Sequence, residues 1–193
     1  KNFGKSWKKD VKLTSIDRFS SYNPTITATQ NGFVAVAWRD GKYGSISDGF
    51  WLSIIERHST NYGINWSGEN LLTRRPEGTW TDTPYYQTVS IEKNNFPLVI
   101  TWSIDTIGSS GPPFGYQVRA RVYTGKGNSW CSELNLTPNA DFCDEPTIAV
   151  TKTRIIMAWR ERDSITHQFH PFVRTIKIDT TKIKLQPLGF SSI

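Results

Sequence analysis

The 193-residue sequence has few cysteines and no long apolar segment. Its two cysteines, Cys131 and Cys143, are too few for a disulfide framework, although they could pair in a secreted chain. No apolar run approaches the ~20 residues of a membrane-spanning helix. Cys-x-x-Cys zinc spacings, Gly-rich phosphate loops and a Gly-x-Ser-x-Gly elbow are also missing. We therefore expect no cofactor, no structural metal and no membrane insertion.

Positive charge is present but is not concentrated. The net charge is +6, and the densest local group is Lys5, Lys8, Lys9 and Lys12. Nucleic-acid binding would require a basic stripe with interleaved stacking aromatics. A scattered distribution is typical of solvated strand faces, so we expect no nucleic-acid partner.

Aromatic residues are abundant, at 13% of the chain, and they mark a repeat. The pattern Gly-x-(Ser/Asn)-Trp occurs at 4–7, 63–66 and 127–130, with the tryptophans 59 and 64 residues apart. Asn61 and Gly63 tolerate the positive φ that tight turns need, and a tryptophan then opens the next strand with a large apolar body. Regular spacing of such a pattern indicates a true internal repeat.

Two further markers have a similar period. Pro24, Pro84 and Pro146 are expected to open the first strand of each unit, and Trp38, Trp102 and Trp159 to close the second. In the first unit, strands are expected at 23–28, 33–38, 50–58 and 66–72. In the second unit they are expected at 83–89, 96–102, 116–123 and 130–136. In the third unit they are expected at 145–150, 154–159, 172–179 and 183–190. An isolated outer strand is expected over 1–15, followed by units at 20–73, 82–137 and 144–190.

Four strands in each unit of about 60 residues, without helical periodicity, predict an all-β fold. The fixed turn chemistry favours a β-propeller of four-stranded antiparallel blades. A β-sandwich is the rival, but it does not need a repeating four-strand unit.

The stretch Ser59-Thr60-Asn61-Tyr62-Gly63-Ile64-Asn65-Trp66 resembles the Asp-box, or BNR repeat, of sialidase-like β-propellers, with Asn61 at the Asp position. Residues 2–7 resemble the second half of this box, and residues 123–130 are a weaker match. The resemblance covers nearly the whole chain and implies a structural role for these turns, away from the ligand face. The residues that carry it are Gly4, Trp7, Ser59, Asn61, Gly63, Trp66, Gly127 and Trp130.

Three blades and one extra strand are fewer than the four to eight that usually close a propeller. The chain is therefore expected to contribute about half of a larger ring, with six blades as the favoured number. The remaining blades would come from a longer polypeptide or from a second copy.

Long, varied loops carry polar side chains to one end of the expected propeller, where binding residues concentrate. Candidates on this ligand face are Arg39, Asp40, Trp80, Asp82, Asp105, Asp144, Glu145, Arg160, Arg162 and Asp163. Asp144-Glu145 could serve as an acid/base pair, but such pairs more often cap loops. His167 and His170 lack a third metal ligand and are expected to be exposed loop histidines.

The family resemblance implies an arginine just before an Ile-Pro at the first inner strand of a sialidase. Asn23, Thr83 and Glu145 occupy the corresponding places, so no catalytic residue carries over. We expect a non-catalytic binding or scaffold protein, secreted or at the cell surface, that recognises a glycan or protein. An exo-sialidase whose arginines lie partly outside this chain is the first alternative, and a structural part of a larger surface assembly is the second.

Overall fold

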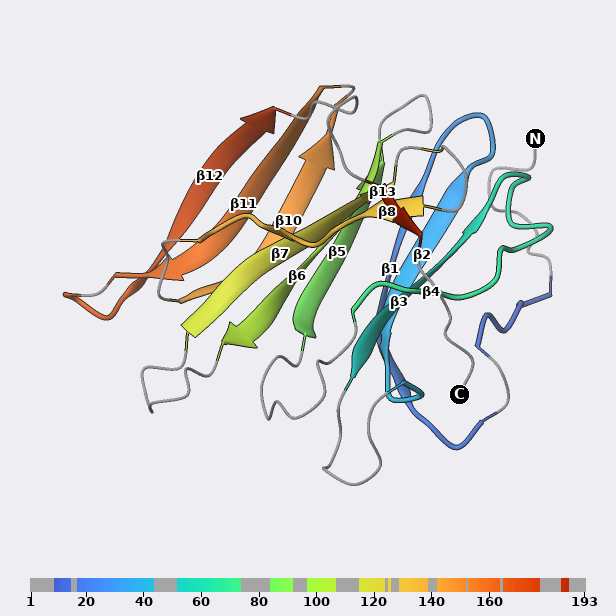
Figure 1. Cartoon of the computed structure of the whole chain (residues 1–193), viewed down its shortest axis with the longest axis horizontal. Coiled ribbons are helices and arrows are strands. Elements are labelled where there is room, and N and C mark those ends of the chain that lie inside the picture. The colour runs from blue at the N-terminus through green and yellow to red at the C-terminus, as the bar shows by residue number, and fades with distance from the viewer. Residues whose placement is uncertain are drawn as a thin grey trace.

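The computed structural model describes residues 9–14, 17–43, 52–73, 84–91, 97–106, 115–123, 125, 129–138, 142–151, 153–163, 165–177 and 185–187. Side chains are not described at 84–91, 105–106, 115, 129 and 185–187. Every regular element within these ranges is a β-strand, as the sequence predicts (Figure 1). The described part of the chain accordingly contains no helix that could span a membrane.

Sheet 1 contains the strands β1 (Ser21–Ala28), β2 (Val34–Asp40), β3 (Ser53–Ser59) and β4 (Asn70–Leu71), in that order and antiparallel. These strands fall where the first unit was expected. The fourth is much shorter than the predicted 66–72: Trp66 Nε1 donates back to the Gly63 carbonyl of the turn, and Ser67 makes one backbone bond to His58 of β3 before the strand begins.

Sheet 2 contains β5 (Pro84–Ile91), β6 (Leu98–Thr106), β7 (Gly115–Tyr123) and β8 (Ser129–Cys131), with β9 (Leu134–Asn135) paired to β7 and β13 (Leu185–Pro187) paired to β8. The predicted fourth strand of this unit, 130–136, is thus split into β8 and β9. Sheet 3 contains β10 (Cys143–Val150), β11 (Arg154–Arg162) and β12 (Phe169–Lys177).

Two expected strands differ from the structure. Residues 183–190 were expected beside β12, but Leu185–Pro187 pair with β8 of sheet 2, whose outer edge would otherwise leave backbone groups unpaired. Residues 9–14 form no strand, although 1–15 was predicted as one. The carbonyl of Leu13 accepts a hydrogen bond from the Arg57 side chain instead of from a neighbouring strand.

The prolines do not all occupy equivalent positions. Each first strand contains a bulge, and the pairs that follow it are Thr25–Ala37, Thr88–Thr101 and Thr147–Ala158. Pro24 and Pro146 directly precede these pairs, whereas Gln87 takes that place in sheet 2 and Pro84 lies three residues earlier. The proline marker of the second unit is therefore out of register, while Trp38, Trp102 and Trp159 are equivalent.

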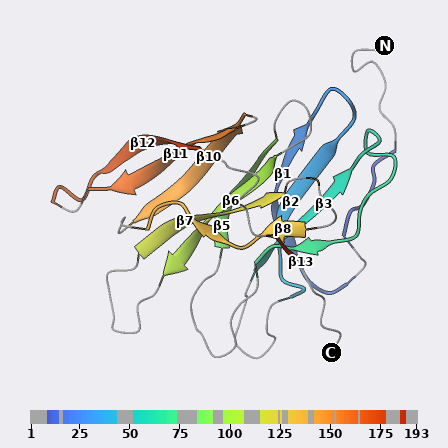
Figure 2. The same cartoon turned by 45° about the horizontal axis from the view of Figure 1, so that its top comes forward.

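The three sheets stack side by side, with β5 between β1 and β10 (Figures 1 and 2). We call the face that carries Trp38, Trp102 or Trp159 the Trp face of its sheet and the other one the reverse face. Alternation along each strand sends neighbouring residues to opposite faces, so one strand can supply two cores.

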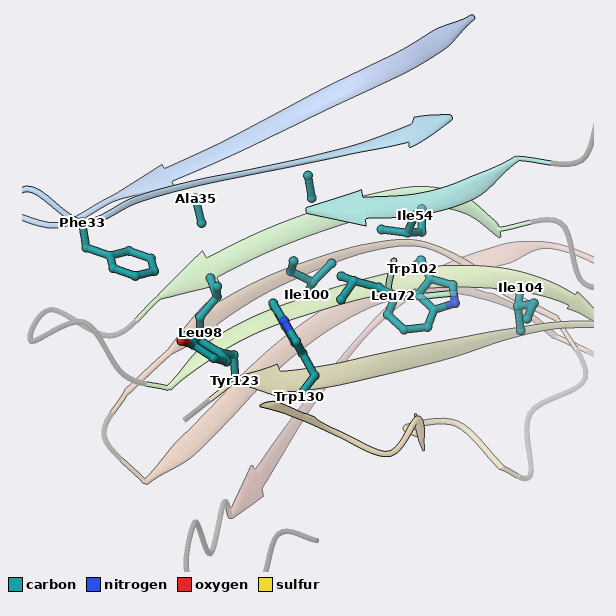
Figure 3. Packing of buried hydrophobic residues seen from close by; sticks show 11 residues of the cluster. Phe33, Ala35, Ile54, Leu72, Leu98, Ile100, Trp102, Ile104, Tyr123 and Trp130 are labelled. Atoms are coloured by element: carbon teal, nitrogen blue, oxygen red, sulfur yellow. The ribbon is translucent and has the colours of Figure 1, made fainter. Parts of the chain in front are cut away.

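One core lies between sheets 1 and 2 (Figure 3). Ala35 and Ala37 on the reverse face of sheet 1 meet Leu98, Ile100 and Trp102 on the Trp face of sheet 2, and all five are fully buried. Full burial of a large apolar side chain stabilises the fold by roughly 1.5–3 kcal/mol.

The second core repeats this rule between sheets 2 and 3. Val99 and Val118 on the reverse face of sheet 2 pack with Ile155, Met157 and Trp159 on the Trp face of sheet 3. The reverse faces of sheets 1 and 2 therefore each pack on the Trp face of the next sheet.

Candidate functional site

The strand register gathers several candidate residues at one end of the sheets. Asp40 pairs with Ser21 and Ser53, and Glu161 pairs with Cys143 and His170. We call this the loop end, since the long connections after each second strand begin here.

Seven sequence-predicted site residues with described side chains lie at or near the loop end: Arg39, Asp40, Asp144, Glu145, Arg160, Arg162 and Asp163. Trp80 and Asp82 lie outside the described residues, as do Gly4, Trp7 and Gly127 of the turn motif. Asp105 lies in β6 opposite Tyr116, and its side chain is not described.

Asp40 is a structural residue rather than a ligand-facing one. Its carboxylate is buried and accepts hydrogen bonds from Trp38 Nε1 at 2.9 Å, Ser21 Oγ at 2.8 Å and the Lys42 amide at 2.8 Å. Buried carboxylates are stable only when their oxygens are satisfied in this way. Asp40 therefore links the ends of β1 and β2 through hydrogen bonds.

Glu161 repeats this contact in sheet 3. It accepts hydrogen bonds from Trp159 Nε1 at 2.9 Å and from Cys143 Sγ at 3.3 Å, so Cys143 stands where sheet 1 has Ser21. Burial, with the Glu161 carboxylate beside it, raises the pKa of the Cys143 thiol to about 12. Cys131 is also buried, both thiols are free, and burial raises the pKa of Cys131 too.

Sheet 2 lacks this contact. Ile104 occupies the position two residues after Trp102, where Asp40 and Glu161 stand in the other sheets. Trp102 Nε1 is buried without a hydrogen-bond partner among the described residues. The carboxylate contact is therefore a property of the two outer sheets.

Arg160 is the centre of a charged group at the loop end of sheet 3. Its guanidinium forms a bidentate pair with Asp144, at 2.9 and 2.8 Å, and lies 3.5 Å from Glu145. Asp144 is nearly buried, whereas the side chains of Arg160 and Glu145 are 42% and 49% exposed. The arrangement thus presents charged groups to solvent while one buried carboxylate fixes the arginine.

Aromatic rings surround this group. The Arg160 guanidinium lies 4.4 Å from the centroid of the Phe169 ring, and Phe169 is partly exposed. Phe142 contacts Phe169 and Tyr116 edge to face, at 5.4 and 4.5 Å between centroids. Tyr116 belongs to sheet 2, so the rings span the junction of sheets 2 and 3. We call Phe142, Asp144, Glu145, Arg160 and Phe169 the Arg160 cluster.

The equivalent place in sheet 1 is simpler. Arg39 Nη2 donates to Asn23 Oδ1 at 2.6 Å, where sheet 3 has Arg160 and Glu145. Leu52 precedes Ser53 where Phe169 precedes His170, so an aliphatic side chain stands in sheet 1 at the position of the Phe169 ring. Asn23 and Glu145 share a positive φ, of 50° and 49°.

The remaining candidates form a turn. Asp163 accepts hydrogen bonds from the amides of Ile165 and Thr166 and from the Thr166 hydroxyl, and these bonds lower the pKa of its carboxyl. His167 has a positive φ and donates its amide to the Asp163 carbonyl. Asp163 is thus a turn residue, and the described side chains include no group that could hold a metal.

The Ser59–Trp66 turn lies at the opposite end of sheet 1. Ser59 Oγ accepts hydrogen bonds from the Asn61 and Gly63 amides, and Asn61 Oδ1 accepts one from the Asn65 amide. Trp66 Nε1 donates to the Gly63 carbonyl at 3.0 Å, and Gly63 has a φ of 77°. This geometry suits the structural role expected of the turn. Trp130 of the third motif is fully buried in the first core.

Sequence reasoning missed a buried polar group between sheets 1 and 2. Glu56 is fully buried, accepts a hydrogen bond from Asn70 Nδ2 at 2.7 Å and contacts His58 Nδ1 at 3.0 Å. His58 lies against the Phe33 and Tyr123 rings. Burial, with a contribution from Glu56, raises the pKa of Tyr123. The group joins two sheets within the core, away from the loop end.

It also missed Phe142 and Phe169. The available signal was an aromatic residue immediately beside the start of a strand at the loop end, next to the charged run 160–163. The charged residues were singled out, but the rings were not.

No family model and no curated protein matches this chain. Among solved structures, Zg3597, a family 117 glycoside hydrolase produced by the marine bacterium Zobellia galactanivorans, is similar, with a TM-score of 0.52 and 12% sequence identity. The match covers 89% of this chain and 56% of that chain, so this chain spans about half the length of its structural neighbour. The likeness shows an all-β fold shared with that protein, and it does not confirm membership of the sialidase-like repeat family.

Proposed function

We propose that this chain is part of a β-propeller that binds a carbohydrate, without hydrolysing it, through the Arg160 cluster at its loop end. The observation that carries the proposal is the pairing of exposed planar polar groups with an exposed ring. Arg160 and Glu145 are about half exposed, and Arg160 lies over Phe169.

This combination suits a sugar. A pyranose has hydroxyl groups around its rim and apolar C–H faces, so it is held by planar charged side chains beside an aromatic surface. The Asp144 pair fixes the guanidinium in place, and preorganised groups lose less freedom on binding. Sheet 3 offers such an arrangement, and Leu52 stands in sheet 1 at the position of Phe169.

The backbone at Glu145 positions its side chain. A glutamate at a φ of 49° is unusual, and Asn23 has a φ of 50° at the equivalent place in sheet 1. The conformation therefore belongs to the shared scaffold and does not by itself distinguish the two sheets. The bulge in β10 directs Glu145 to the loop end beside Arg160.

The structural neighbour gives a context for this ligand class. A protein described as a glycoside hydrolase shares the fold, and a glycan ligand would also suit the secreted or cell-surface location expected from the sequence. Two alternatives are also to be tested. One is a protein ligand at the same end of the sheets, and the other is a purely structural role in a larger assembly.

Binding is favoured over hydrolysis by the state of Asp144. Both of its oxygens already accept hydrogen bonds from Arg160, and its side chain is nearly buried. A general acid or base must reach the reacting atom directly or through one water. The exo-sialidase alternative would need catalytic arginines from outside this chain.

The test is a binding screen against neutral, sulfated and sialylated oligosaccharides, with affinities then measured by calorimetry. Phe169→Ala is expected to weaken binding of a hit about tenfold, through loss of the ring surface. Glu145→Gln, which keeps the size of the side chain, is expected to weaken it less. Arg39→Ala is the matched control and should leave affinity unchanged.

Two results would redirect the proposal. Equal loss of affinity in Arg39→Ala and Phe169→Ala would place the site elsewhere. Release of monosaccharide from any oligosaccharide that binds, detected by chromatography, would favour the glycoside hydrolase alternative.

A further inference from the structure

An exposed aromatic ring lies at the end of sheet 1 opposite the loop end. Tyr62 is 70% exposed and Ile64 is 65% exposed, and both belong to the Ser59–Trp66 turn. A single apolar side chain on a protein surface needs no explanation. Tyr62 differs from such a residue because its ring is held in place although most of it lies in solvent.

Three contacts with the hairpin 29–33, which joins β1 to β2, hold Tyr62. Its amide donates to the Gly32 carbonyl at 2.8 Å, and its hydroxyl donates to the Gln30 carbonyl at 3.3 Å. The ring also lies directly against Gly32, since a Cβ added there would come within 2.6, 2.7 and 2.9 Å of the neighbouring ring atoms Cε2, Cδ2 and Cζ. One side of the ring therefore rests on the backbone of the hairpin.

The turn does not itself require a tyrosine at this position. Tyr62 has a φ of 60°, which asparagine and glycine adopt more readily than a bulky residue does. The side-chain hydrogen bonds that close the turn are made by Ser59, Asn61 and Trp66. The ring of Tyr62 is thus available for another role.

Amide groups flank the ring, and the two segments that surround it are uncharged. Asn31 is exposed in the hairpin, and Asn61 is partly exposed in the turn. The Oδ1 atom of each accepts a hydrogen bond from its own segment, whereas the Nδ2 groups donate none within the described part of the chain. Neither 29–33 nor 59–66 contains a charged residue.

This arrangement suits a neutral sugar. The faces of a pyranose carry C–H groups that stack on an aromatic ring, and its hydroxyls accept hydrogen bonds from amide N–H groups. Tyrosine offers a large contact surface with little loss of side-chain freedom, and asparagine offers adaptable hydrogen bonds. A ring that is already fixed loses still less freedom on binding. We propose that Tyr62, Asn31 and Asn61 form a second carbohydrate site, which takes a neutral pyranose unit.

The second site does not depend on the Arg160 cluster, which lies at the loop end of sheet 3, and the experiment separates the two. Isotope-labelled wild type and Phe169→Ala are titrated with neutral hexasaccharides of glucose, mannose, galactose and xylose, and chemical shifts are followed by NMR. In both proteins at least one hexasaccharide is expected to shift the amide signals of Asn31, Gly32 and Tyr62, with a dissociation constant of about 1 mM. Shifts at Tyr62 without shifts at Arg160 would support this site and contradict the proposed function.

Variants of Tyr62 test the role of the ring. Tyr62→Asn removes the ring but keeps a residue that tolerates a positive φ, and it is expected to raise the dissociation constant at least about tenfold. Tyr62→Phe keeps the stacking surface and loses the bond to Gln30, so the constant should change less than about threefold. Tyr22→Ala is the matched control, because Tyr22 is 41% exposed at the loop end of the same sheet, and it should leave affinity unchanged. Circular dichroism checks that each variant is folded.

Three results would overturn the proposal. The first is the absence of any shift at Tyr62 and Asn31 with each hexasaccharide at about 10 mM. The second is a folded Tyr62→Asn variant that binds as tightly as the wild type. The third is tighter binding at Tyr62 of a sulfated form of the same hexasaccharide, which would contradict a neutral ligand.

Discussion

The loop ends of sheets 1 and 3 have the same backbone and different chemistry. Both have a bulged first strand, a positive φ just before a proline, and an arginine directly after a tryptophan. Sheet 1 places Asn23 beside its arginine. Sheet 3 places Glu145 and Asp144 there and adds the Phe169 ring. The scaffold is thus held in common, and the two loop ends differ in the described side chains that surround the arginine.

The carboxylate contact with tryptophan belongs to the shared scaffold. Asp40 and Glu161 each accept a hydrogen bond from the indole two residues before them. A charged residue at the loop end is therefore not by itself a sign of a binding site.

The largest expected effect comes from removing this contact in sheet 1. Asp40→Ala loses three hydrogen bonds and leaves the buried Trp38 Nε1 without its acceptor, at a cost of about 3 kcal/mol in the free energy of unfolding. Glu161→Ala loses two bonds, one of them from a weak thiol donor, at a cost of about 1.5 kcal/mol. Urea unfolding measures the loss of unfolding free energy in both variants. Equal losses in Asp40→Ala and Glu161→Ala would contradict the expected difference between sheets 1 and 3.

A smaller difference is expected between two tryptophans. Trp38→Phe removes a hydrogen bond to Asp40, whereas Trp102→Phe removes an indole N–H that has no partner among the described residues. Both changes remove ring volume, but only the first breaks a bond. Trp38→Phe should therefore cost about 1 kcal/mol more than Trp102→Phe. The reverse order in urea unfolding would show that Trp102 has a partner that matters.

The smallest effect concerns Cys143, which replaces the serine of sheet 1. Its pKa of about 12 lies above the ordinary value of 9.0, so its thiol stays protonated in the folded state while the unfolded chain ionises first. This difference in pKa adds to the free energy of unfolding below pH 9, and the added stability is lost as the pH rises towards 12. Cys143→Ser should flatten the loss of stability between pH 8.5 and 9.5 relative to wild type, by roughly 1 kcal/mol or less.

Alkylation is the companion measurement. Neither Cys143 nor Cys131 should react with iodoacetamide at pH 8 in the folded chain, since both thiols are buried and protonated. Rapid labelling of Cys143 under these conditions would contradict the placement of its thiol against Glu161.

Much of the fold was predictable from the sequence because turn and strand chemistry is local. Gly63 and Trp66 define their turn through contacts within eight residues. Trp38, Trp102 and Trp159 occupy equivalent positions, but they do not close their strands, which continue for two to four further residues. The wrong predictions concern contacts between distant parts of the chain. Residues 185–187 pair with the open edge of sheet 2. Residues 9–14 form no strand, and the Leu13 carbonyl accepts its hydrogen bond from the Arg57 side chain.

The candidate site was predictable only in part. A charged run such as 160–163 is visible in the sequence, and the structure brings Asp144, Glu145 and Arg160 together at one end of sheet 3. Which charge is structural depends on burial, so the buried Asp40 could not be told from the half-exposed Glu145. Phe142 and Phe169 become neighbours only through the pairing of β10, β11 and β12.

The central claim is that the loop end of sheet 3, and not that of sheet 1, carries the binding chemistry. It is tested most directly by chemical-shift mapping of the isotope-labelled 193-residue chain titrated with an oligosaccharide from the binding screen. The account predicts shifts at the Arg160 side-chain N–H and at residues 142–145 and 169, with none at Asn23 or Arg39. Shifts centred on Asn23 and Arg39, or an unperturbed Arg160, would contradict it.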